Sequence, residues 1–185
     1  MNKDYSNYLL SIILIIIVIS SGVLFVFAKI RKKSKINAGI QPIRGGSISI
    51  FFDRMENVTI IPDVKDKYGL GKATADVELI KKPYSARKLG SVVRQSMNRC
   101  IKGVTCENRE LFEKLQSYDW VQFTEGKRNI SVYFKENYGI IFNTTRRKLD
   151  GAYQFNYNGV EKTLPADTND EILGSTLLQL LQKCR

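Results

Sequence analysis

The sequence contains no histidine and only three cysteines. The absence of histidine excludes Ser-His-Asp and Cys-His nucleophile systems, histidine proton shuttles and nearly all catalytic zinc sites. Cys100 and Cys106 lack the spacing of a Cys-X-X-Cys redox or zinc motif, and with Cys184 they are expected to be reduced packing residues. No pair of carboxylates stands out as an acid and a base. We therefore expect no catalytic residues, no metal site and no cofactor, and the protein is not expected to be an enzyme.

The length and composition indicate one folded domain with short appendages. The 185 residues fall within the roughly 100 to 200 that a domain usually occupies. Hydrophobic residues make up 43% of the chain and charged residues 25%, so there is enough apolar material for a core. A large multidomain enzyme is excluded.

The longest uncharged stretch is residues 9–28, LLSIILIIIVISSGVLFVFA. At about 1.5 Å per residue, a helix of this length spans roughly 30 Å, the hydrocarbon thickness of a bilayer. A cleaved secretory signal and a buried core helix are the alternatives. The apolar region of a signal is only about 7 to 15 residues long and ends at a small-residue cleavage site, whereas this one ends at a basic cluster. The stretch therefore predicts a transmembrane helix.

The basic cluster follows the apolar stretch and consists of Lys29, Arg31, Lys32, Lys33 and Lys35. The positive-inside rule then predicts a single-pass protein with residues 1–8 as a short external tail and the carboxyl-terminal part in the cytoplasm. Anionic membrane lipids are the expected partners of the cluster, because each cation gains about 1 kcal/mol near their headgroups. Residues 29–46 are predicted to be a basic juxtamembrane tether, and residues 47–185 the folded domain.

The formal net charge of the whole chain is +11, and residues 36–185 hold 23 basic and 17 acidic residues, a net of +6. Positive and negative residues alternate along this part of the chain. A nucleic-acid-binding surface usually needs a continuous basic stripe, so nucleic acid is not the expected partner.

One pattern of strands and helix occurs twice in the domain. Residues 47–53 (SISIFFD) resemble residues 129–135 (NISVYFK), and Leu89-Gly90-Ser91 recurs as Leu173-Gly174-Ser175. Each half is predicted to contain paired strands, a further short strand and a helix. The expected fold class is α+β, a mostly antiparallel sheet packed by helices in two strand-strand-strand-helix pseudo-repeats. The glycines inside both helices each cost about 1 kcal/mol relative to alanine, so we expect another element to approach closely there.

The predicted helices have recognisable starts. Ser85 is expected to cap the first, and Thr168 with Glu171 three residues later forms a capping box for the second. On the first helix, Arg94 lies outside the apolar stripe and is expected to point to water. A connecting helix between the two halves is predicted over residues 108–118 from its apolar spacing.

The most concentrated charge in the domain is the run Arg146, Arg147 and Lys148. A solvated hairpin tip before the Asp150-Gly151 turn is one interpretation, and a binding site is the other. Aromatic residues follow at alternate positions, where they should share one sheet face: Tyr153, Phe155 and Tyr157. If that face is open, the composition fits a protein-binding hot spot, and we expect Arg146, Arg147, Lys148 and Tyr153 to contact the partner. Trp120 is expected to be a core anchor.

Several short motifs occur together between Asp76 and Cys184: Leu89-Gly90, Tyr118-Asp119-Trp120 leading to Phe123, the strand Ile130 to Phe134, Leu173-Gly174 and Lys183-Cys184. This run, about three-fifths of the chain, resembles the CdiI-type immunity proteins of bacterial contact-dependent growth inhibition. The resemblance implies a small α/β protein, not an enzyme, that binds and neutralises a cognate toxin domain, commonly a nuclease.

The resulting hypothesis is an immunity protein anchored in the bacterial inner membrane, with a cognate protein toxin domain as its partner. Tethering would raise the local concentration of the inhibitor where a toxin enters the cell. The alternative is a membrane-anchored adaptor with a basic surface for anionic lipid, nucleic acid or another protein. Strong salt dependence of binding would favour the adaptor.

Overall fold

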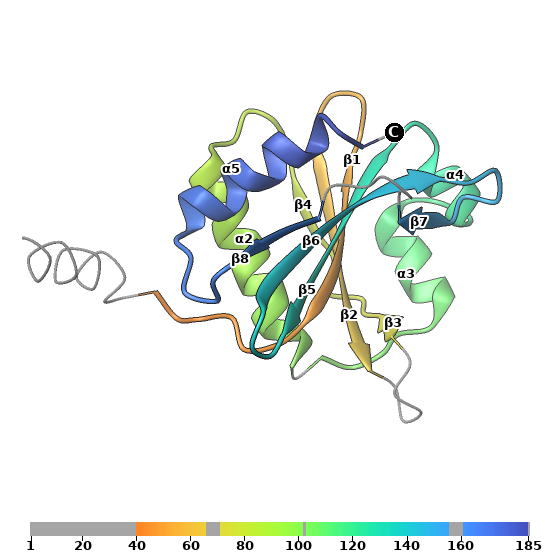
Figure 1. The fold of residues 1–185 in the computed structure, drawn as a ribbon. Coiled ribbons are helices and arrows are strands. Elements are labelled where there is room, and N and C mark those ends of the chain that lie inside the picture. Colours follow the sequence, from red (N-terminus) through yellow and green to blue (C-terminus); the bar gives the residue numbers. More distant parts are fainter. Residues whose placement is uncertain (1–39, 66–70, 102, 156–160, 185) are drawn as a thin grey trace, which may run out of the picture. The chain divides into compact units, whose positions relative to one another are not determined.

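The computed structural model describes residues 40–65, 71–101, 103–155 and 161–184 (Figure 1). Residues Gln41–Arg185 form one unit of the chain. The predicted transmembrane helix at 9–28 and the basic cluster at 29–35 lie outside the described residues. Within the described ranges, every helix is too short or too polar to cross a bilayer.

The sheet is antiparallel, which confirms the α+β prediction, and it is curled (Figure 1). Two hairpins form its centre. The strands of these hairpins are β1 (Ser47–Phe52), β2 (Val58–Lys65), β5 (Arg128–Lys135) and β6 (Gly139–Arg147). Two short strands pair along the outer edge of β2, namely β3 (Gly71–Ala73) and β4 (Glu78–Ile80). Two more pair along the outer edge of β6, namely β7 (Tyr153–Phe155) and β8 (Glu161–Leu164).

The pairing of β1 with β5 relates the two halves of the domain. Ser49 lies opposite Ser131, its equivalent in the repeated sequence. On either side of this pair, Ile48 lies opposite Val132 and Ile50 opposite Ile130. The strands therefore meet about a local two-fold axis through the two serines, and the edge pairings of the second half repeat those of the first.

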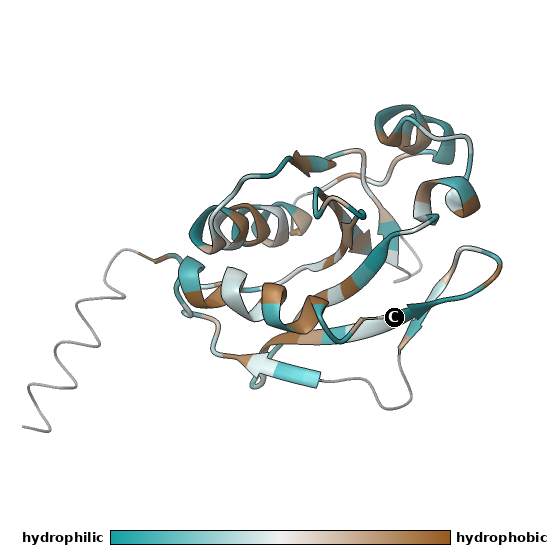
Figure 2. Cartoon of the chain, turned by 90° about the horizontal axis from the view of Figure 1, so that it is seen from above, coloured by the Kyte–Doolittle hydropathy of each residue, from teal (hydrophilic) through white to brown (hydrophobic). Residues whose placement is uncertain are grey.

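One face of the sheet is covered by α2 (Ala86–Cys100) and α5 (Asp170–Leu181), which lie side by side (Figure 1). Alternate strand residues such as Ile50 and Phe52 point into this layer, because side chains along a strand point to opposite faces. Figure 2 shows apolar residues interspersed with polar ones along both the strands and the helices. The main core is therefore the space between this face of the sheet and the two helices.

The two helices approach closely at their glycines, as the sequence predicts. A Cβ atom built on Gly90 would overlap the carbonyl oxygen of Asp170, and one built on Gly174 would overlap that of Ala86. The contact is reciprocal, since Ala86 and Asp170 occupy equivalent positions in the two halves. Only glycine leaves room for this crossing.

The helix caps agree with the prediction at one helix and correct it at the other. The Ser85 side chain accepts a hydrogen bond from Lys88 N at 3.1 Å, which confirms the first cap. The second cap is Asn169, which accepts from Ile172 N at 2.9 Å, and not Thr168. Thr168 instead uses its carbonyl oxygen to accept a hydrogen bond from Arg94.

Arg94 does not point to water as the helical periodicity suggested. Arg94 is only 8% exposed, because the start of α5 lies against α2 at this point. Its Nε atom lies 2.7 Å from Asp170 Oδ1, and Nη1 donates to the carbonyl oxygen of Gln41 at 2.9 Å. Two elements far apart in sequence are thus joined to α2 by one guanidinium.

Residues 41–46, part of the predicted tether, instead pack against the folded domain. Ile43 is fully buried in the main core, and its backbone N donates to the carbonyl oxygen of Ala166 at 3.0 Å. Burial of an apolar side chain and pairing of its backbone give this segment a fixed place. The ordered packing therefore begins about six residues before the boundary predicted at Ser47.

The other face of the sheet carries a helical pair between the halves, α3 (Asn108–Leu115) and α4 (Trp120–Thr124) (Figure 1). α3 ends earlier than the predicted 108–118, because Gln116 adopts a left-handed conformation with φ of 52°. Asp119 then caps α4 by accepting from Gln122 N at 2.8 Å. These helices build a second, smaller core with the sheet, whose buried members are Phe51, Ile61, Cys106, Leu111 and Phe123.

Candidate protein-binding surface

The β6–β7 hairpin ends in a turn that presents an apolar side chain between two cations. Arg146 and Lys148 are exposed, and Leu149 at the apex is 99% exposed. The Asp150-Gly151 turn forms as predicted, with Asp150 Oδ1 accepting from Ala152 N at 3.0 Å and Gly151 at φ of +81°. A single exposed leucine is ordinary, but exposed apolar residues that gather on one surface mark contacts with partners, so the surroundings of this apex decide its role.

The hairpin tip lies against α4. A Cβ atom on Gly151 would come within 2.9 Å of Val121 Cα, so the turn and the helix are in close contact. Val121 and Trp120 of α4 are themselves exposed, so the helix brings apolar side chains to solvent where the hairpin contacts it. We call this the tip–α4 surface and define it by Tyr118, Trp120, Val121, Arg146, Lys148 and Leu149.

Arg147 holds this arrangement together. Its Nε donates to Thr124 Oγ1 at 3.0 Å, Nη2 to the carbonyl oxygen of Val121 at 2.9 Å, and Nη1 to that of Lys148 at 3.3 Å. Since the guanidinium is occupied by α4 and the hairpin itself, Arg147 positions the surface. Its neighbours Arg146 and Lys148 point away from these contacts, because alternate strand residues face opposite sides.

Tyr153 is half-buried and also has partners within the domain. Its hydroxyl donates to the carbonyl oxygen of Lys127 at 2.7 Å, and its ring lies 5.6 Å from that of Phe51, edge to face. Burial raises the pKa of Tyr153 to about 12, so the hydroxyl stays a donor at neutral pH. Burial also lowers the pKa of Lys127, whose ammonium lies 3.8 Å above the Phe123 ring.

Trp120 is both a core residue and a surface residue. Its ring centroid lies between 5.5 and 6.1 Å from three other rings, those of Phe51, Phe112 and Phe123. It is nevertheless 37% exposed, because α4 lies at the border of the second core. The predicted anchor is therefore present, but one edge of it reaches solvent beside the hairpin tip.

A pocket of about 310 Å³ opens where the tip, α4 and the sheet meet. We call it the aromatic pocket, and its lining residues are Ser49, Phe51, Trp120, Asn129, Asp150, Gly151, Ala152 and Tyr153. Asp150 supplies the charged group among them. A second hollow on the hairpin is lined by Arg146, Arg147, Lys148, Leu149, Asp150 and Gln154, so Asp150 borders both this basic hollow and the aromatic pocket.

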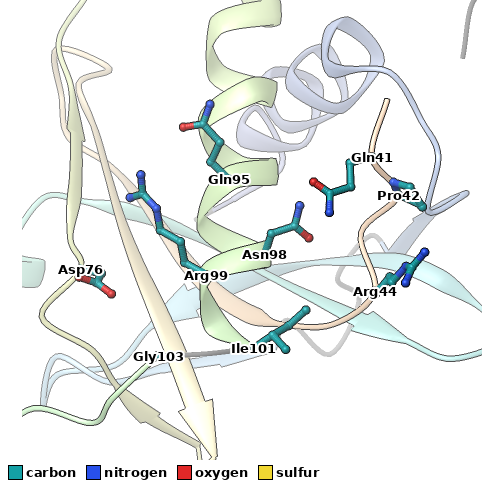
Figure 3. Close-up of a pocket in the computed structure, with 9 residues that line it drawn as sticks. All are labelled: Gln41, Pro42, Arg44, Asp76, Gln95, Asn98, Arg99, Ile101 and Gly103. Atoms are coloured by element: carbon teal, nitrogen blue, oxygen red, sulfur yellow. The ribbon is translucent and has the colours of Figure 1, made fainter. Parts of the chain in front are cut away.

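A second candidate pocket, of about 630 Å³, lies at the end of α2 beside the segment that begins at Gln41 (Figure 3). Arg44, Arg99 and Asp76 bring charge to it, but Arg99 is paired with Glu78. Its remaining polar lining consists of amides, and Figure 3 shows them spread over α2 and the incoming segment. Nothing in this arrangement selects a particular ligand.

The described part of the chain bears on metal and thiol chemistry through two features, the spacing of acidic and thiol groups and the burial of the cysteines. Within it, no three Cys, Asp or Glu side chains lie close enough to hold a metal ion. Cys100 and Cys184 are buried, with Sγ atoms 3.3 Å from the carbonyl oxygens of Ser47 and Asn129 respectively. Burial raises the pKa of both thiols, which disfavours the reactive thiolate.

No family model matches the sequence, and no curated protein matches it. Among solved structures, the fold resembles a protein of unknown function from Neisseria meningitidis, with a TM-score of 0.59 and 11% identity over 78% of this chain and 98% of that chain. It also resembles a chain of the CdiA-CT/CdiI toxin and immunity complex from Yersinia pseudotuberculosis, with a TM-score of 0.57 and 13% identity over 78% of this chain and 100% of that chain. At these identities the likeness shows a shared fold.

Proposed function

We propose that the protein is an immunity protein that binds and neutralises a cognate toxin domain of a contact-dependent growth inhibition system. The observation that carries the proposal is the fold, which is shared with a chain of a toxin and immunity complex. The sequence motifs between Asp76 and Cys184 support the same class. Neutralisation would be achieved by binding, since the described residues offer no catalytic cluster.

The tip–α4 surface is the proposed contact with the toxin. Its apolar members Leu149, Val121 and Trp120 are exposed, and the turn at Gly151 holds the hairpin tip against α4. Arg146 and Lys148 are exposed on the same hairpin. Aromatic and apolar anchors with a charged rim are the usual composition of binding hot spots. Of the residues predicted from sequence, Arg146 and Lys148 are available for the partner, whereas Arg147 and Tyr153 hold the surface in place.

Leu149→Asp should weaken toxin binding by about thirtyfold, because it places a charge where an apolar anchor is buried in the complex. The toxin is first captured from the source cells with the full chain, and a one-to-one partner is tested for growth inhibition that this protein relieves. Affinity is then measured by calorimetry for the wild type and the variant.

Tyr138→Asp is the matched control, because Tyr138 is 61% exposed at the opposite end of β6. It should bind as the wild type does. Equal weakening by both variants would contradict the assignment of the surface. Recovery of only nucleic acid or lipid, lost with added salt, would contradict the immunity function itself.

We further propose that residues 9–28 anchor the protein in the bacterial inner membrane, with the folded domain in the cytoplasm. The support is the uncharged stretch of twenty residues followed by the basic cluster at 29–35. The full chain should stay with membranes after alkaline carbonate washing, and a chain lacking residues 1–35 should be released. Equal protection of cells by both chains at matched expression would show that the anchor is dispensable.

A further inference from the structure

The aromatic pocket is built by the part of the domain that is not repeated. The two halves match strand for strand, but α3 and α4 have no equivalent after the second half among the described elements. Trp120 enters the pocket from α4, and Phe51 and Ser49 enter from β1. The corresponding place on the other half of the sheet therefore lacks such a wall.

The walls of this pocket are aromatic. The rings of Trp120 and Phe51 lie 6.1 Å apart, and those of Phe51 and Tyr153 lie 5.6 Å apart. Ring faces attract cations through their quadrupole, and tryptophan does so best. The volume of about 310 Å³ is at the small end for ligand sites, so it suits one side chain and not a cofactor.

Two side chains of the pocket, those of Asn129 and Asp150, can offer it hydrogen-bond acceptors. Asn129 is 3% exposed and uses Nδ2 to donate to the carbonyl oxygen of Ile50 at 3.2 Å. Its Oδ1 accepts from Thr145 Oγ1 at 3.0 Å, and an amide oxygen can accept two hydrogen bonds. Asp150 adds a carboxylate, of which Oδ1 accepts from Ala152 N. Asp150 is the one charged residue among those that line the pocket, so a positively charged guest with hydrogen-bond donors matches this lining.

The pocket is formed before any partner arrives. Arg147 fixes the hairpin to α4 by hydrogen bonds to Thr124 and Val121, and the Tyr153 hydroxyl is fixed to Lys127. A preformed pocket lowers the ordering cost of binding. The hydrogen bonds of Arg147 and Tyr153 within the domain therefore fix the shape of the pocket before a side chain of the partner enters it.

We propose that the aromatic pocket receives an arginine side chain of the toxin. The guanidinium is planar and stacks on aromatic rings, and its five N–H donors match the acceptors from Asp150 and Asn129. Lysine would offer three donors and no flat surface. This inference rests on the proposed function, and it names the chemistry by which the tip–α4 surface selects its partner.

Trp120 is the only tryptophan of the chain, so its fluorescence reports directly on the pocket. The full chain in mild detergent is titrated with N-acetylarginine amide and with N-acetylcitrulline amide, a neutral probe of the same shape. The arginine probe should change the emission of Trp120 saturably in the millimolar range. The citrulline probe should need about fivefold more, because it lacks the charge that Asp150 attracts.

Asp150→Asn is the variant that tests the charge, since its side-chain oxygen can still accept from Ala152 N and keep the turn. It should weaken the arginine probe about fivefold and leave the citrulline probe unchanged. Tyr138→Ala, at the far end of β6, should leave both probes unchanged, because Tyr138 does not line the pocket.

Equal responses to the two probes, or no saturation by either, would overturn the arginine assignment while toxin binding by the wild type still upheld the immunity function. Asp150→Asn should also weaken toxin binding about fivefold. A selective arginine response in a protein that binds no toxin would overturn the proposed function and, with it, the toxin as source of the guest.

Discussion

Alanine at Gly90 or Gly174 should lower the free energy of unfolding by about 3 kcal/mol. In either variant the new Cβ atom would overlap a backbone carbonyl of the other helix, that of Asp170 or Ala86. Backbone atoms cannot rotate away as a side chain does, so α2 and α5 must move apart and lose packing. Alanine's better helix propensity, about 1 kcal/mol, offsets only part of this loss.

Gly71→Ala provides the control for this experiment. Gly71 lies in the short strand β3, and a Cβ atom there would have no neighbour within 4 Å. Urea unfolding of the three variants and the wild type, followed by circular dichroism, measures the differences. A midpoint for Gly90→Ala equal to that of Gly71→Ala would show that the helices can separate at little cost, contrary to the structure.

Arg94→Leu should cost about 3 kcal/mol of stability, because it removes the buried partner of a half-buried ion pair together with its hydrogen bonds to two backbone carbonyls. Asp170 would keep its carboxylate without a counter-charge, and the carbonyl oxygens of Gln41 and Thr168 would each lose a donor. The segment that begins at Gln41 should also loosen. Faster amide hydrogen exchange at Ile43, relative to the β5–β6 hairpin, would register that change.

The pair of Arg87 and Glu171 is a matched control, because it joins the same two helices and Glu171 is the next residue after Asp170 on α5. Their side chains are 78% and 56% exposed and the charged atoms are 3.6 Å apart, so the pair is open to water. Arg87→Leu should therefore change stability by less than about 1 kcal/mol. Similar losses in both arginine variants would mean that burial does not set the strength of the Arg94 pair.

The sheet could be predicted from sequence because its signals are local. Alternation of apolar residues in 47–53 and 129–135 indicates half-buried strands, and the repeat places them as equivalents. The prediction that Arg94 points to water was wrong because its burial depends on a contact distant in sequence. Helical periodicity shows which side faces the sheet, but it does not show that α5 crosses α2 and covers a second side.

The candidate surface was predicted only in part. The charged run and the Asp150-Gly151 turn indicate a hairpin tip. The sequence does not show that Leu149, beside that turn, is exposed, because leucine is usually buried. Its exposure of 99% follows from its position at the apex. The neighbourhood of Trp120 and Gly151 joins residues about thirty positions apart, which no local pattern encodes.

The local two-fold axis through Ser49 and Ser131 has a consequence for how this surface can vary. Two identical half-length chains related by such an axis would carry every substitution twice, once on each side. A single chain that contains both halves carries it once. Substitutions in α3 and α4 therefore alter the partner-binding side once, without a second copy elsewhere in the domain. The contact of α2 and α5 at Gly90 and Gly174 does not change with them.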